Sequence, residues 1–157
     1  MENILWIGTI NNLKEKNFQT LFGLWLLQHM ETFECSATFE LKLVKGKSLP
    51  YSSVKPHQIQ ALQDAKSAEG IYHKINDSPI FFGNKTRFTN PKPFDCFLIK
   101  NAKAYIVLWF YKPRQQKIMY FIDIDKFVKY KNQSIRKSIT EDEMVGLSEV
   151  VKLTKGG

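Results

Sequence analysis

The chain has 157 residues, of which 43% are hydrophobic and 13% aromatic, with 8 glycines and 6 prolines. These values exclude a disordered or low-complexity chain, and the length predicts one domain, residues 1–157, around a single core. Lys and Arg number 23 against 15 acidic residues, and the resulting net charge of +8 favours a polyanionic partner, nucleic acid before a membrane surface.

The chain has two cysteines, Cys35 and Cys96. Without a CxxC or Cys/His spacing they indicate neither a zinc site nor a disulfide framework. Residues 1–10 lack the charged start and long apolar core of a signal peptide, and no run of about 18 apolar residues occurs. We therefore expect a cytoplasmic protein with no membrane partner, or one in the host cytoplasm if the source is viral.

The first two predicted elements are a helix over residues 17–30 and a strand over residues 36–44. In the helix, apolar residues recur with mostly helical spacing and no proline interrupts them. In the strand, apolar and polar residues alternate. Glu40 and Lys42 therefore share one face of the strand and lie side by side.

A basic loop and a second helix are expected next. Residues 45–50 (KGKSLP) break the strand. Pro56 suits the first position of a helix, and Gly70 is the expected stop after its C-terminus. The apolar stripe of this helix consists of Ile59, Leu62 and Ala65.

Four strands and a long loop follow in the prediction. Residues 70–75 predict a short strand, and residues 78–93 a polar loop that is a candidate substrate contact. Two further strands cover residues 95–99 and 104–111, separated by a connection of hairpin length. Residues 118–124 predict the last strand.

The order of these elements predicts a mixed α/β sandwich around one central sheet. Its core covers about residues 15–128, followed by a C-terminal basic segment and a short helix within residues 129–157. Thr140 and Glu143 have the spacing of a capping box and predict the start of that closing helix.

Glu40, Leu41 and Lys42 carry the candidate chemistry. Hydrolysis of a phosphodiester needs stabilisation of the phosphate charge and a hydroxide nucleophile, and a divalent ion held by carboxylates supplies both. Glu40 is a candidate ligand, and Leu41 could add its backbone carbonyl. Lys42 could orient or deprotonate the attacking water, or neutralise developing charge. Glu-x-Lys is common by chance, so its context matters.

Residues 39–42 (FELK), the loop after them and residues 56–62 (PHQIQAL) together resemble the PD-(D/E)xK nucleases, especially the Holliday junction resolvases of bacteria and archaea. The resemblance covers roughly residues 18–127. It implies a restriction-endonuclease-like fold, in which a mixed central sheet is flanked by helices. It also implies an Mg²⁺-dependent DNA endonuclease, with Mn²⁺ as a substitute, that acts on branched DNA as a homodimer.

The same resemblance implies roles for individual residues. Glu40 and Lys42 correspond to the second acidic residue and the lysine of the motif, and Gln58 to an auxiliary polar residue that faces the active site. The family's first Asp usually lies on the preceding strand, where this chain has only Glu31 and Glu34.

Asp95 is the first choice for the missing carboxylate, because it stands at the start of an apolar strand after a proline. Catalytic constellations recur with different chain orders. Asp77 is the second choice, and Glu31 or Glu34 the third. The expected metal ligands are Asp95, Glu40 and the Leu41 carbonyl.

Several basic residues are candidate DNA contacts. They are Lys45, Lys47, His57, Lys85, Arg87 and Lys92, with Lys112 and Arg114 at a strand end. His57 lies at a helix N-terminus, which favours phosphate. His29 and His73 are expected to have packing or hydrogen-bonding roles. A denser basic cluster fits a solvated face as well as a phosphate contact, and it comprises Lys126, Lys129, Lys131, Arg136 and Lys137.

Two other functions stay open at this point. A restriction or homing endonuclease of the same fold would read base edges in duplex DNA. A non-catalytic DNA-binding module would keep the basic surface but have a degraded metal site, which is an alternative because the upstream Asp is missing.

Overall fold

The computed structural model describes residues 5–6, 13–29, 36–74 and 96–153. Its centre is a five-stranded sheet with the strand order β1-β2-β6-β7-β9. The strands are β1 (Leu5–Trp6), β2 (Ala37–Val44), β6 (Lys103–Phe110), β7 (Lys117–Asp123) and β9 (Glu149–Leu153). β2 is parallel to both β1 and β6, whereas β7 is antiparallel to both β6 and β9. The central sheet is therefore mixed, as expected.

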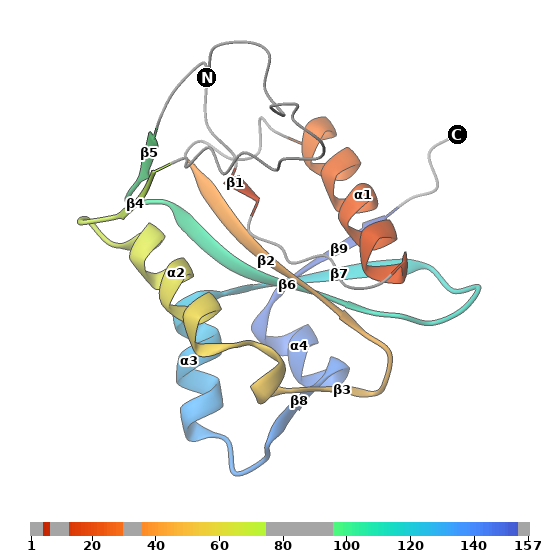
Figure 1. Cartoon of the computed structure of the whole chain (residues 1–157). Helices are drawn as coiled ribbons and strands as arrows, with labels where there is room; N and C mark the ends of the chain where they lie inside the picture. Colours follow the sequence, from red (N-terminus) through yellow and green to blue (C-terminus); the bar gives the residue numbers. More distant parts are fainter. Residues whose placement is uncertain (1–4, 7–12, 30–35, 75–95, 154–157) are drawn as a thin grey trace, which may run out of the picture.

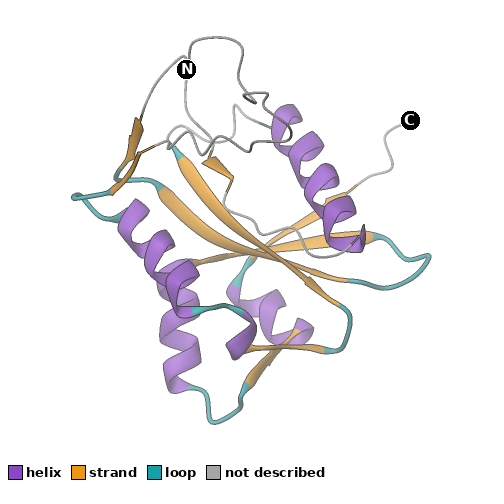
Figure 2. Cartoon of the chain, viewed as in Figure 1, coloured by secondary structure: helices purple, strands orange, loops and turns teal. Residues whose placement is uncertain are grey.

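Helices cover both faces of this sheet (Figures 1 and 2). One face is covered by α1 (Leu13–Gln28). The other is covered by α2 (Pro56–Lys66), α3 (Ile124–Gln133) and α4 (Glu141–Leu147). The chain is thus a mixed α/β protein with a central sheet flanked by helices. No helix within the described ranges is long and apolar enough to span a membrane.

The sheet separates two apolar cores, where the sequence had predicted one. Phe18 and Phe22 of α1 pack against Phe39 and other side chains on their face of the sheet. On the opposite face, Leu62 of α2 and Phe127 of α3 belong to the second core. The alternation of β2 therefore serves two buried surfaces, since both faces of a central strand are covered.

The first helix begins at Leu13, earlier than the expected residue 17. The residues added at its start include Lys14, Glu15 and Lys16, which favour helix without extending the apolar stripe that marked the prediction. The second helix, by contrast, begins at Pro56 as expected.

The stretch expected to be a basic loop contains a short strand. Residues Ser48–Pro50 form β3, which pairs antiparallel with β8 (Ser138–Thr140), and the 3-10 helix η2 (Tyr51–Ser53) follows. Leu49 lies opposite Ile139, and both side chains are buried. The strand could not be predicted from the turn-forming residues 45–50 alone, because it depends on an apolar partner far along the chain.

Gly70 is not the residue that ends α2. The helix ends at Lys66 with Ser67 as its C-cap, in extended conformation. Gly70 has a φ of +78°, and a Cβ built there would lie 2.4 Å from the Ile99 carbonyl oxygen. Glycine is needed at this position for the turn into β4 (Ile71–Lys74) and for the close approach of a second strand.

The predicted hairpin between the strands around residues 95–99 and 104–111 is wrong. β5 (Cys96–Ile99) pairs with β4 in a separate two-stranded ribbon, whereas β6 pairs with β2 and β7. The connection is a corner, because Asn101 N–H donates to the Ser67 carbonyl and Ala102 N–H to the Ala65 carbonyl. These bonds to the end of α2 turn the chain away from β5.

The C-terminal region contains more regular structure than expected. The helix α3 spans the end of the expected core and the start of the basic segment, and its two buried residues, Ile124 and Phe127, are a sparse signal among charged neighbours. The closing helix is confirmed as α4, and Thr140 accepts a hydrogen bond from Glu143 N–H at its start. The edge strand β9 was not predicted, because it is short and mostly exposed.

Candidate functional site

The site is built on the middle of β2. Glu40 and Lys42 lie two residues apart on the same face, and they stand opposite Ile106 and Leu108 of β6. Lys42 Nζ lies 2.9 Å from Glu40 Oε1, and the two side chains are only 15% and 3% exposed. The side-by-side placement expected from the alternation is therefore present, in the layer between the sheet and α2.

Gln58, in the first turn of α2, connects these two residues. Its Nε2 donates to Glu40 Oε1 at 2.7 Å, and its Oε1 accepts from Lys42 Nζ at 3.1 Å. The Oε1 atom also accepts from the backbone N–H of Lys55 at 2.9 Å. One amide thus joins the acidic residue, the lysine and the N-terminus of α2, and the expectation that Gln58 faces this site agrees with the geometry.

The orientation of the Gln58 amide follows from its partners. Both groups at Oε1 are donors, and the group at Nε2 is a carboxylate, which only accepts. Exchanging the two ends of the amide would place donor against donor twice and lose all three bonds. The amide therefore holds the strand and the helix in one fixed relation.

Lys55 is the residue of this group that the sequence analysis missed. It acts through its backbone N–H, which is a free helix-start donor that any residue except proline would supply. Its position directly before Pro56 is the only signal in the sequence, since a proline at the first helical position places the preceding residue at the N-cap.

Burial of opposite charges gives the site its electrostatic character. Removing two charges from water is costly, and the cost is offset only when attraction and hydrogen bonds are well aligned. Glu40 has a direct ion pair and a hydrogen bond from Gln58. Chemically, the group combines a carboxylate, a ligand suited to hard divalent cations, with an ammonium suited to a phosphate or to a nucleophilic water.

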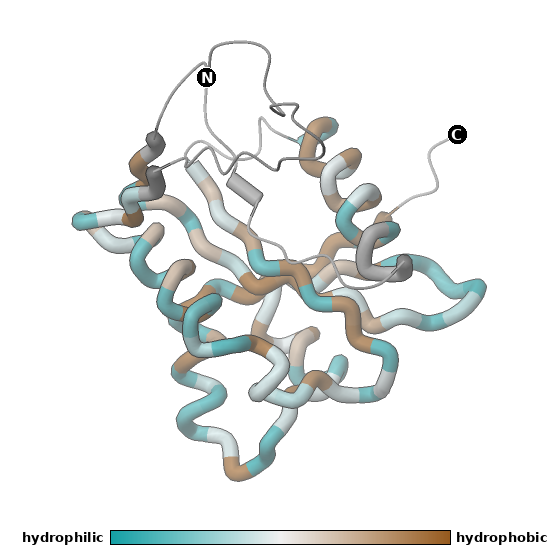
Figure 3. Tube along the Cα trace, in the orientation of Figure 1, coloured by the Kyte–Doolittle hydropathy of each residue, from teal (hydrophilic) through white to brown (hydrophobic). Residues whose placement is uncertain are grey.

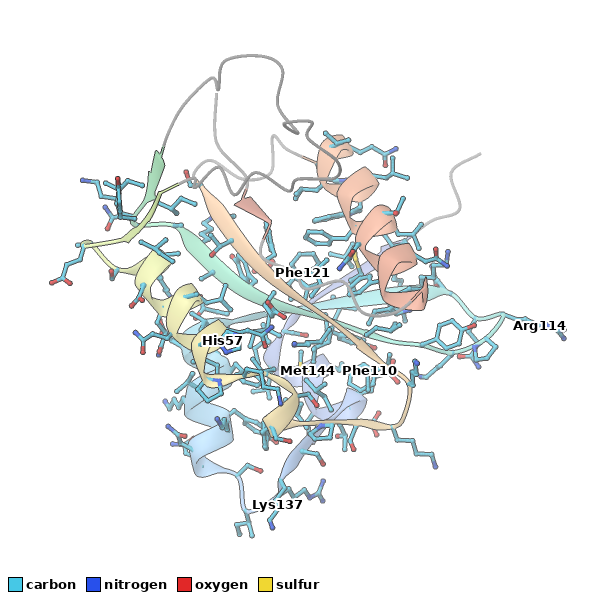
Figure 4. All side chains as sticks on the ribbon, viewed as in Figure 1. His57, Phe110, Arg114, Phe121, Lys137 and Met144 are labelled. Carbon is cyan, nitrogen blue, oxygen red and sulfur yellow. The ribbon has the colours of Figure 1, made fainter. Side chains whose placement is uncertain are left out.

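Exposed basic residues lie in the sequence on either side of the site. Lys45 and Lys47 follow β2 directly, and Lys55 and His57 stand at the start of α2. Figure 4 shows His57 on that helix, beside the sheet. Lys112 instead forms an ion pair with Glu141, and Arg114 lies in the β6–β7 connection, at the far side of the molecule in Figure 4.

Of the remaining residues singled out from the sequence, Leu41 and His29 lie within the described ranges and several others lie outside them. Leu41 has a side chain that is 5% exposed and belongs to the α1 core, so only its backbone lies between Glu40 and Lys42. His29 Nδ1–H donates to the Trp25 carbonyl at 2.8 Å and the ring stacks on that of Trp25, as in a packing residue. The residues outside the described ranges are Glu31, Glu34, Cys35, Asp77, Lys85, Arg87, Lys92 and Asp95.

No protein-family model, curated protein or solved structure matches this chain. The function must therefore be argued from the residues and their geometry.

Glu40 fits a divalent metal in its donor chemistry, but the described residues do not provide a complete ligand set. Across the ranges that the structure describes, no group of three or more His, Cys, Asp or Glu side chains could hold a metal ion. Asp95 directly precedes β5 in the sequence and lies outside those ranges.

Proposed function

We propose that the chain is a metal-dependent DNA endonuclease that hydrolyses phosphodiester bonds in branched DNA, with a four-way junction as its substrate. The supporting observation is the buried group formed by Glu40, Lys42 and Gln58. A carboxylate and an ammonium two residues apart on one face of a strand, with an auxiliary polar residue of the following helix facing them, is the arrangement that the PD-(D/E)xK resemblance implied.

The proposed cofactor is Mg²⁺, for which Mn²⁺ would substitute. Glu40, the Leu41 carbonyl and Asp95 would hold the ion, which would supply Lewis-acid activation of the phosphate and of water. The buried Glu40 carboxylate supports this assignment, since it is fixed by Gln58 and only 3% exposed. Asp95 is proposed from its place in the sequence directly before β5.

Each residue of the site has a defined role in this proposal. Lys42 holds its ammonium 2.9 Å from Glu40 Oε1, where it would neutralise phosphate charge or orient the attacking water. Gln58 is a positioning residue, because it fixes Glu40 and Lys42 from the helix side. In this proposal Glu40 and Lys42 act only if their side chains keep these positions.

The proposed DNA contacts are the exposed basic residues that flank the site. Lys45, Lys47 and His57 are exposed at the ends of β2 and α2, where phosphate contacts would position the backbone. Lys85, Arg87 and Lys92 complete the proposed contacts. A two-fold homodimer would cut the two strands of a junction symmetrically.

The decisive test replaces Glu40 by Gln. Cleavage of a four-way junction in Mg²⁺ should fall by at least about 100-fold, since a neutral amide is a poor ligand for the metal. Glu69→Gln, at an exposed residue after α2, is the matched control and should leave the rate unchanged. If Glu40→Gln cleaves at the wild-type rate with its fold intact by circular dichroism, the proposal is wrong.

A non-catalytic DNA-binding module is the second candidate, favoured by the incomplete ligand set within the described ranges. Titration with Mg²⁺ and Mn²⁺ by calorimetry separates the two. Binding that Glu40→Gln removes supports the nuclease, whereas DNA binding without any metal binding selects the module. Cleavage of a linear duplex at one sequence, with junctions ignored, would instead indicate a restriction or homing endonuclease.

A further inference from the structure

The turn between α3 and β8, residues 134–137, has an unusual side chain at its tip. Ile135 has a relative exposure of 103%, the highest among the exposed large hydrophobic residues of the described chain. In Figure 3 this turn is a hydrophobic bend between hydrophilic segments, at the foot of the molecule, where Figure 4 labels Lys137. A single exposed apolar residue is ordinary by itself, so its surroundings decide its meaning.

The turn is fixed by hydrogen bonds on both sides of Ile135. Ser134 N–H donates to the Tyr130 carbonyl at 2.9 Å, and Arg136 N–H donates to Ser134 Oγ at 3.2 Å. Tyr51 N–H donates to the Lys137 carbonyl at 3.0 Å, next to the β3–β8 pairing. Ile135 is thus presented at a fixed projection, because its neighbours are tied to α3 and to η2.

The two residues that follow Ile135 in the turn are cationic. Arg136 is 70% exposed in its side chain and has one ion-pair partner, Glu143, at 3.5 Å. Lys137 is exposed, and no ion pair is found for it among the described residues. A single exposed apolar side chain followed directly by two exposed cations does not fit an ordinary apolar protein interface, which needs several contiguous apolar residues at its centre. It fits a polyanion that contains apolar surfaces.

We propose that the α3–β8 turn is a second nucleic-acid contact, in which Ile135 inserts between base pairs while Arg136 and Lys137 bind the adjacent phosphates. Isoleucine is one of the side chains that proteins insert into base steps, where it unstacks and kinks the duplex. This inference rests on the proposed function for its choice of DNA, but it concerns a different surface from the Glu40 site.

The turn is also connected to that site through the chain. Tyr51, which holds the Lys137 carbonyl, begins η2, and the chain then reaches Lys55 at the N-cap of α2. One backbone hydrogen bond and a short segment of chain therefore connect the turn to the helix that carries Gln58. Unstacking at the turn is the means by which the protein would favour a branch or a flexible step over regular duplex.

The experiment uses four-way junctions and linear duplexes that carry 2-aminopurine at successive positions, with the full chain in EDTA so that nothing is cleaved. Wild-type protein should raise the fluorescence at one or two steps, because 2-aminopurine brightens when it loses its stacking. Ile135→Ala should remove at least half of that rise while the protein still binds the junction. Val145→Ala, at an exposed valine of α4, is the control and should behave as wild type.

A second variant tests the phosphate contact. Lys137→Gln should weaken binding and reduce the slope of log Kobs against log salt by about one, as expected for the loss of one phosphate contact. The fluorescence rise per bound complex should be retained. The inference is overturned if wild type binds without a rise at any labelled step, or if Ile135→Ala retains the full rise. It is also overturned if Ile135→Ala changes the sedimentation of the DNA-free protein, which would make a second copy the occupant.

Failure of this inference differs from failure of the proposed function. If Glu40→Gln cleaves normally while Ile135→Ala loses the fluorescence rise, the nuclease site is wrong and the inserted residue stands. If Glu40→Gln abolishes cleavage while Ile135→Ala retains the rise, the nuclease stands and the insertion is wrong.

Discussion

Gln58 does more for the site than its neutral side chain suggests. It satisfies Glu40, Lys42 and the Lys55 N–H at once. A carboxylate and an ammonium alone on a strand would keep considerable freedom in the lysine stem, whereas the amide limits that freedom from a second element. Positioning of this kind affects rate and stability together.

Replacing Gln58 by Ala should lower junction cleavage by about 10- to 100-fold, because residues that orient ligands from outside typically contribute that much. The same change should cost about 1–3 kcal/mol of unfolding free energy, since it leaves buried polar groups unsatisfied. Cleavage assays and urea unfolding measure the two effects. Gln60→Ala is the control, because Gln60 is exposed and bonds only Asp64 in its own helix. Equal losses in both variants would contradict the role given to Gln58.

The sequence predicted a large part of this group of residues. The alternation around Glu40 and Lys42 depends only on the period of a strand, so the pair was accessible from local pattern. Gln58 came from the resemblance. The Lys55 contribution was not accessible, because a backbone N–H has no side-chain signature. Asp95 lies outside the described residues, so its role remains a prediction.

At the scale of elements, the start of α4 shows how capping sets a charge. The pKa of Glu143 lies below its ordinary value of 4.5 because the Thr140 backbone N–H, the Thr140 hydroxyl and the Tyr130 hydroxyl all donate to it, which outweighs the opposing effect of burial. A carboxyl group whose pKa is lower in the folded protein than in the unfolded chain stabilises the fold at pH values above the unfolded pKa. That stability is lost as the pH falls through the folded pKa.

Thr140→Ala should therefore cost about 1 kcal/mol at pH 7, the usual value of an N-cap. The cost should shrink at a pH below the folded pKa of Glu143, where the protonated side chain no longer gains from the hydroxyl donor. Urea unfolding of both proteins at pH 7 and at a series of falling acidic pH values would measure it. A cost that stays constant with pH would show that Glu143 gains nothing from Thr140. Ser52→Ala, at an exposed hydroxyl in η2, is the control.

Two glycines should respond in opposite ways to alanine. Gly23 lies inside α1 with nothing within 4 Å of a built Cβ, so Gly23→Ala should stabilise by about 0.5–1 kcal/mol. Gly70→Ala should destabilise by more than about 1 kcal/mol, because it has a φ of +78° and its Cβ would lie 2.4 Å from the Ile99 carbonyl oxygen. Thermal unfolding distinguishes the two. Stabilisation by both would contradict the turn into β4.

The elements themselves were more predictable than their partners. Helices and strands with a regular apolar period, such as α2 and β2, could be read locally. β3 could not, because it depends on Leu49 meeting Ile139 far along the chain. The false hairpin has the same cause: connection length limits what can pair, but hydrogen bonds from Asn101 and Ala102 to the end of α2 decide where the chain goes.

For the whole molecule, the net charge of +8 makes DNA binding strongly dependent on salt. Replacing both Lys45 and Lys47 by Gln should weaken binding to a duplex and reduce the slope of log Kobs against log salt by about one to two. Fluorescence anisotropy at several salt concentrations measures this. The paired change Lys103→Gln and Lys117→Gln removes the same charge elsewhere and serves as the control. An equal loss of slope in both would assign the effect to net charge alone.

Composition predicted this charge and the order of the expected elements predicted the mixed α/β class, but neither could predict that the central sheet would divide the apolar residues into two cores. That division depends on which strands become neighbours. The parallel pairing of β2 with β6 is the clearest case, since it joins segments separated by much of the chain.

This pairing has a consequence for synthesis. Domains are made from the N-terminus at a few residues per second, on the order of 5–20. β2, which carries Glu40 and Lys42, emerges from the ribosome well before β6, so Val44 has no partner until Phe110 has been made. For several seconds the strand would be an apolar segment with an open edge, at risk of pairing with another chain. A pause in translation between residues 45 and 110 should therefore lower the yield of folded protein more than a pause after residue 110.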